Sequence, residues 1–220
     1  MRNGSKGELV MITRRKKQSP IVRMIYLAIL TALVMVLHFS GIGIKLPFLS
    51  TPVSLTLIPI AICGMLLGPV SGAFLGFVYG LTVYISLGVM GMDTFTNILF
   101  ISNPVITFLI CTVKTTLAGF LSGVLYNAIK GKNVIVATFA SACIAPVVNT
   151  GIFILGCLLI TDTIASMEMF QAFFESGKSV VYLIVIILPG INFIFEFIFN
   201  AILSPTIHRI VTVVSKRISK

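Results

Sequence analysis

The sequence predicts an all-α integral membrane protein, a compact bundle of six transmembrane helices with both termini in the cytoplasm. The chain has 220 residues, of which 57% are hydrophobic and only 10% are charged. Its mean hydropathy is +1.11, and apolar runs recur at lengths near the roughly 20 residues that a helix needs to cross the hydrocarbon core. Soluble domains carry about 25% charged residues, so that class is excluded.

Six apolar segments follow when the chain is divided at charges, Gly-Pro pairs and polar clusters. Gly68-Pro69 separates the second segment from the third with almost no loop, and Lys130 and Lys132 lie between the fourth and the fifth. We therefore expect a basic N-terminal arm (1–22), a membrane domain (23–214) and a basic tail (215–220). The predicted transmembrane segments are residues 24–39, 53–67, 70–89, 104–129, 134–160 and 180–214.

The positive charges predict the orientation of this bundle, because loops rich in Lys and Arg remain cytoplasmic. Thirteen of the 16 Lys and Arg residues lie before the first segment, between the fourth and fifth segments, or at the C-terminus. The opposite side has only Lys45 and Lys178, together with four of the six acids. We expect a multi-pass protein of the cell membrane, and we attribute the net charge of +10 to this orientation rather than to a nucleic-acid partner.

The sequence contains no pattern that predicts catalysis or a cofactor. The four cysteines lie in apolar stretches without CxxC spacing or a neighbouring His, so neither a disulfide framework nor a metal site is expected. Phosphate-binding and hydrolase motifs are missing as well. We therefore expect a protein that is not an enzyme and holds no cofactor.

Two ionisable residues lie inside predicted segments, where a charge costs at least a few kcal/mol unless it faces a partner or a wet cavity. Lys114 comes eleven residues after Asn103, about 16 Å along a helix, and Glu196 comes sixteen residues after Val180, about 24 Å. Two interpretations stay open. The residues form an ion pair that holds two helices together, or Lys114 is a cation held for an anionic ligand.

Polar uncharged residues near helix-breaking prolines extend this pattern. Asn149 and Thr150 follow Pro146, and Asn192 follows Pro189 and Gly190. Broken helices in membranes line protein cavities, where transported ligands bind. Asn97 and Asn103 lie at the outer end of the fourth segment; ordinary helix-helix or capping hydrogen bonds are the alternative for each Asn. The candidate substrate-binding residues are Asn97, Asn103, Lys114, Asn149, Thr150, Asn192 and Glu196.

Small residues recur every fourth position in two places, which puts them on one helical face. Such faces let helix backbones approach closely in lipid. The first group predicts packing within the bundle, and it comprises Gly64, Gly68, Gly72, Gly76 and Gly80. The second is the AxxxA pattern formed by Ala28 and Ala32, which predicts a surface that receives a partner helix, although such pairs also arise by chance.

With these features the chain resembles the substrate-binding S component of energy-coupling factor (ECF) vitamin transporters, over about residues 23–214. The resemblance lies in Ala28-Ile-Leu-Thr-Ala32 and in Leu-Leu-Gly-Pro-Val-Ser-Gly-Ala-Phe-Leu-Gly at residues 66–76. It implies that the chain captures a vitamin with high affinity between the fourth, fifth and sixth segments. It also implies docking through Ala28 and Ala32 onto a membrane-embedded coupling subunit that works with two cytoplasmic ATPases.

Residues 145–153, Ala-Pro-Val-Val-Asn-Thr-Gly-Ile-Phe, are similar to those of S components assigned to pantothenate. We therefore expect a small carboxylate vitamin such as pantothenate, with folate, riboflavin, niacin and a non-vitamin carboxylate left open. Two other functions stay open. One is a self-sufficient proton- or sodium-coupled carrier of a small organic anion, with Glu196 as the coupling residue, and the other is a structural protein without a ligand.

Overall fold

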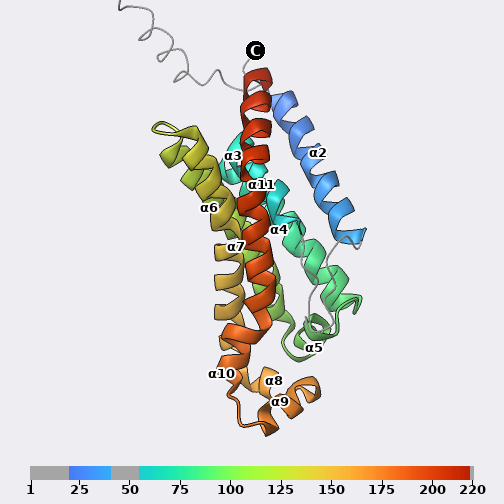
Figure 1. The fold of residues 1–220 in the computed structure, drawn as a ribbon. Coiled ribbons are helices and arrows are strands. Elements are labelled where there is room, and N and C mark those ends of the chain that lie inside the picture. The colour runs from blue at the N-terminus through green and yellow to red at the C-terminus, as the bar shows by residue number, and fades with distance from the viewer. Residues whose placement is uncertain (1–19, 41–54, 219–220) are drawn as a thin grey trace, which may run out of the picture.

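The computed structural model describes residues 20–40 and 55–218, and within these ranges every regular element is helical (Figure 1). The all-α prediction is therefore confirmed for the described chain. The expected N-terminal arm up to residue 19, Lys45 and the first two residues of the second apolar segment lie outside these ranges.

Within residues 20–40 and 55–218, five helices are long and apolar enough to cross a membrane. The second predicted segment (residues 53–67) corresponds to α3 (Leu57–Leu67), which has only 11 residues, so the count of six spans and the orientation of the termini stay predictions. Three of the five long helices are single α-helices: α2 (Pro20–Phe39), α6 (Pro104–Ile129) and α7 (Val134–Leu158). The fourth is α4 (Pro69–Val83) with a π-helical extension (Tyr84–Val89). The fifth, Val180–Ser215, lies within the continuous run of α10 (Val180–Tyr182), a π-helical segment (Leu183–Ile187) and α11 (Leu188–Ile218).

The helix boundaries follow from local chemistry. Pro69 and Pro104 begin α4 and α6, where a missing N–H costs nothing. Gly68 joins α3 to α4 with φ of 99°, a conformation that favours glycine. Asn133 caps α7 because its side chain accepts hydrogen bonds from the first backbone N–H groups of that helix.

The centre of the bundle is the contact of α6 with α4 and α7. Gly72 of α4 and Gly119 of α6 touch backbone to backbone, and a methyl group added to either would collide with the carbonyl of the other. Beside them, Thr115 Oγ1 donates a 2.7 Å hydrogen bond to the carbonyl oxygen of Gly76. The predicted packing role of the glycine face is confirmed at these positions.

Two parts of the fold differ from the sequence-based expectation. Residues 94–102 lie between the third and fourth predicted segments, but they form α5 (Thr94–Ser102), capped by the Asp93 side chain, which accepts a 2.8 Å hydrogen bond from the Thr96 backbone N–H. The connection between α7 and α10 contains α8 (Thr161–Ala165), a 3-10 turn (Glu168–Phe170) and α9 (Gln171–Glu175). In Figure 1 these short helices lie at the end of the bundle opposite the chain's C-terminus.

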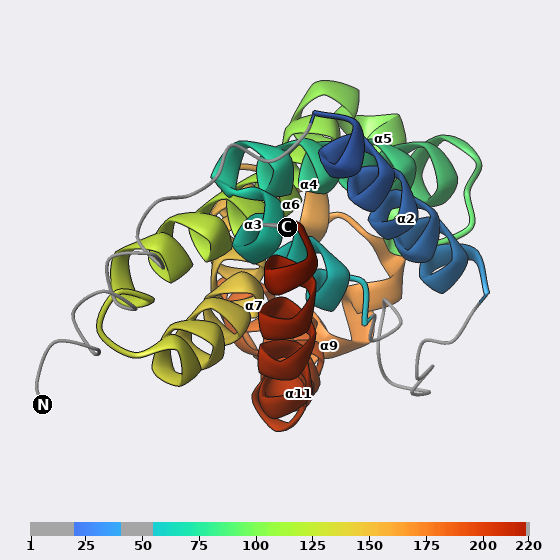
Figure 2. The same cartoon turned by 90° about the horizontal axis from the view of Figure 1, so that it is seen from above.

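α2 lies at the periphery of the bundle (Figure 2). Leu30 and Val34 are its only buried residues, and Arg23 near its start donates a 2.8 Å hydrogen bond to Ser71 of α4. Most of the surface of α2 therefore does not take part in the core of the bundle.

Candidate functional site

Two lines of polar and aromatic side chains run along α7 and α11, which pack against each other. On α11 the line consists of Asn192, Glu196 and Asn200, each four residues from the next. On α7, Asn149 and Phe153 are likewise four residues apart. Because residues four apart share one helical face, each line forms a continuous stripe.

These stripes contain buried hydrogen-bond acceptors without donors. Glu196 is only 4% exposed and Asn200 only 2%. Four side-chain oxygens have no hydrogen-bond partner: Asn149 Oδ1, Asn192 Oδ1, Glu196 Oε2 and Asn200 Oδ1. The Asn200 amide donates a 2.8 Å bond to the Glu196 carbonyl oxygen, so its N–H side is occupied within the helix. An unpaired buried polar group costs about 1–3 kcal/mol, so this region is arranged to receive donors.

Lys114 of α6 supplies the positive charge of the site. Its Nζ lies 5.2 Å from the centre of the Phe153 ring of α7, a cation–π contact that positions the ammonium between the two helices. Lys114 is half-buried.

No salt bridge joins Lys114 to Glu196 in the described part of the chain. The Glu196 Oε2 atom has no hydrogen-bond partner, and the partner of the Lys114 ammonium is the Phe153 ring. The ion pair considered from the sequence is therefore not formed in this structure. The structure thus holds a half-buried cation on α6 and a buried carboxylate on α11 without a salt bridge between them.

Two of the predicted site residues make structural hydrogen bonds. Asn97 Nδ2 donates a 2.7 Å bond to the carbonyl oxygen of Gly88, which joins α5 to the π-helical end of α4. Asn103 Nδ2 donates a 2.9 Å bond to Thr163 Oγ1 of α8. Both asparagines therefore join helices at the end of the bundle that holds the short helices α5 and α8 (Figure 1). Thr150 is half-buried and adjoins Asn149 on α7.

The sequence analysis did not identify two further residues of this region. Phe153 contacts Lys114, and Asn200 continues the α11 stripe. The spacing of four from Glu196 to Asn200 was a signal available in the sequence. The contact of Lys114 with Phe153 depends on how two helices align, and no sequence pattern contained it.

Ala28 and Ala32 were predicted to form a docking surface, and no metal site was expected. Ala28 and Ala32 are both exposed on α2, one turn apart. No group of three or more His, Cys, Asp or Glu residues in the described ranges could hold a metal ion.

The chain matches the family of ECF transporter substrate-specific components over residues 22–208. It therefore belongs to this family, and it is a multi-pass membrane protein with the role of a transporter subunit rather than an enzyme. Membership implies interaction with an ECF module and with a small-molecule substrate. No curated protein sequence matches the chain.

Proposed function

We propose that this protein is the high-affinity capture subunit of an ATP-driven importer in the cell membrane and that its substrate is a small carboxylate vitamin, with pantothenate favoured. The observation that carries the proposal is the contact of the Lys114 ammonium with Phe153, one helical turn from Asn149, whose buried Oδ1 has no hydrogen-bond partner. A carboxylate would pair with the ammonium, since charge-assisted hydrogen bonds are the strongest available to such a ligand.

The unpartnered oxygens support a ligand that also carries N–H or O–H donors. Asn149 and Asn192 come from different helices, and Glu196 lies one turn beyond Asn192. Pantothenate has two hydroxyl groups and one amide N–H in addition to its carboxylate. Each donor that meets a buried acceptor offsets the cost of leaving that acceptor unpaired.

For delivery, we propose that Ala28 and Ala32 form the surface that meets the membrane-embedded coupling subunit. Both are small and exposed, and α2 buries only two of its own residues against the bundle. Small residues one turn apart let a partner helix approach closely in lipid.

Native mass spectrometry of the gently purified chain tests the proposal. We expect a co-purified small carboxylate, or tight binding of added pantothenate and none of pantothenol, its analogue with an alcohol in place of the carboxylate. Equal binding of both compounds would contradict a role for Lys114 in carboxylate recognition. A protein that binds no vitamin of a broad panel would contradict the capture function itself.

A second candidate, a proton- or sodium-coupled carrier, is favoured by one observation, the buried and unpaired carboxylate of Glu196. Such groups serve as coupling residues in transporters. Uptake by the isolated chain in liposomes, driven by an ion gradient and lost in Glu196→Gln, would support this candidate. Uptake that requires the ECF module and ATP supports the first.

A further inference from the structure

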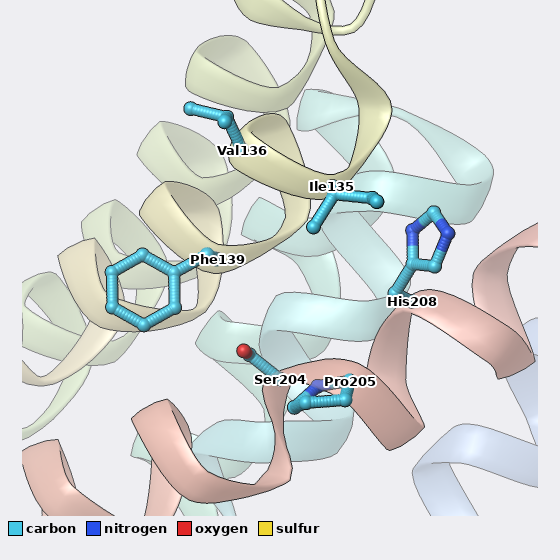
Figure 3. Close-up of a pocket in the computed structure, with 6 residues that line it drawn as sticks. All are labelled: Ile135, Val136, Phe139, Ser204, Pro205 and His208. Carbon is cyan, nitrogen blue, oxygen red and sulfur yellow. The ribbon is translucent and has the colours of Figure 1, made fainter.

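A groove lies between the first turns of α7 and the part of α11 that follows Asn200 (Figure 3). Its volume is about 360 Å³, within the range of about 300–1,000 Å³ found for ligand pockets. Phe139, in this groove, precedes Asn149 by ten residues, about 15 Å along α7. The groove is lined by Ile135, Val136, Phe139, Ser204, Pro205 and His208.

The body of the groove is apolar and faces outward. Ile135 is 65% exposed and Phe139 is 47% exposed, whereas the α11 side is formed by the smaller Ser204 and Pro205. Phe139 lies five residues into α7, about 7 Å from the start of the helix. In a bilayer the groove therefore lies at the boundary between the headgroups and the hydrocarbon layer, where the first methylene groups of an acyl chain are found.

One end of the groove is polar and is flanked by cations. His208 Nδ1 lies 3.4 Å from Thr138 Oγ1, which fixes the ring beside the groove. Lys132 precedes Ile135 by three residues, Arg209 follows His208, and both cations are exposed. Every acidic residue within the described ranges lies elsewhere, four at or beyond the opposite end and Glu196 in mid-helix. The positive end of the α7 dipole adds to this field.

These observations together match the shape and charge of a membrane lipid. An apolar groove open to the hydrocarbon layer suits an acyl chain, and a cationic end without acids suits a phosphate. The groove also lies away from α2, whose exposed face is on another side of the bundle (Figure 2). We propose that this groove binds an anionic glycerophospholipid, with an acyl chain against Ile135 and Phe139 and the phosphate near Lys132, His208 and Arg209.

The chain contains no Trp, so a single introduced indole reports its surroundings without background from others. The test uses Phe139→Trp reconstituted in phosphatidylcholine vesicles that contain a fixed fraction of brominated phosphatidylglycerol or brominated phosphatidylcholine, since bromine quenches the fluorescence of an indole that it touches. The matched control is Phe74→Trp, because Phe74 is exposed (53%) and lies five residues into α4 at the same end of the bundle.

We expect brominated phosphatidylglycerol to quench the fluorescence of Phe139→Trp more efficiently than brominated phosphatidylcholine does, with about a fivefold preference for each cation engaged. The Phe74→Trp control should show no such preference, and Lys132→Gln with Arg209→Gln should remove it from Phe139→Trp. Equal quenching of Phe139→Trp by both lipids, an equal preference in the control, or no quenching would each overturn the proposal. Native mass spectrometry of retained phosphatidylglycerol in the native chain and in the double variant checks the result without an introduced indole.

Discussion

The Lys114 ammonium lies 5.2 Å from the centre of the Phe153 ring, while the nearby Glu196 carboxylate remains buried and unpaired. α6 and α7 thus hold a cation in place through an aromatic face, which has no hydrogen-bonding oxygen to compete with a ligand. A carboxylate entering the site could bind the ammonium without first breaking a salt bridge.

Lys114→Met should weaken the binding of pantothenate by about ten- to a hundredfold, since a hydrogen bond to a charged group contributes about 1.5–3 kcal/mol. Isothermal titration calorimetry in detergent measures the change. Lys178→Met is the matched control, because Lys178 Nζ also lies 5.2 Å from an aromatic ring, that of Phe173, but in the exposed loop region. Equal losses in both variants would contradict a specific role for Lys114.

Glu196→Gln should leave the thermal unfolding midpoint unchanged or raise it, because the variant no longer buries an unpaired carboxylate. The same variant should weaken ligand binding if the carboxylate accepts hydrogen bonds from ligand donors. Unfolding followed by light scattering, with and without pantothenate, gives both values. Glu175→Gln, at the exposed end of α9, is the control, and a large loss of stability confined to Glu196→Gln would indicate a structural role instead.

Gly119→Ala and Gly151→Ala should change stability in opposite directions. A methyl group at Gly119 would collide with the Gly72 carbonyl, whereas nothing lies within 4 Å of a methyl group at Gly151. Overpacking costs about 1–3 kcal/mol, and Gly to Ala in an open helical position gains up to about 1 kcal/mol. Unfolding midpoints of the two variants measure the difference, and a Gly119→Ala protein as stable as the native chain would refute close α4–α6 contact.

Ala28→Phe and Ala32→Phe should reduce assembly with the ECF module while leaving pantothenate binding unchanged, because the added rings lie on the proposed docking surface of α2. Co-purification with tagged module subunits measures assembly. Ala128→Phe is the control, since Ala128 is likewise an exposed alanine, on α6. A parallel loss of ligand binding in the α2 variants would argue against a docking surface.

The positions of most helices and many of their ends could be predicted from the sequence alone. α6 has the bounds that Pro104 and Lys130 predicted, because proline begins a helix readily and the charged, glycine-containing loop ends it. α5 was missed, since Asp93, Thr94, Thr96 and Asn97 read as a loop. Asp93 in fact caps a helix whose apolar residues Phe95 and Leu99 are buried.

The site was predicted only in part for a similar reason. The cost of placing Lys114 and Glu196 in a membrane could be read from the sequence, but the choice between an ion pair and two separate groups depends on the relative shift of α6 and α11. Asn97 was a candidate for its chemistry, and its bond to Gly88 forms through the π-helical geometry that ends α4. Such contacts depend on how helices far apart in the sequence align with each other, and local sequence patterns do not encode that alignment.

The backbone contact between Gly72 and Gly119 also restricts how the molecule can change shape. Most helix interfaces adjust by rotamer changes of the side chains between them, but at this point there are no side chains to rearrange. α4 and α6 should therefore behave as one rigid body. Any opening that admits a ligand to Lys114 must therefore come from displacement of α7, of α11 or of the short helices at the end of the bundle opposite the C-terminus, while α4 and α6 keep their relative position.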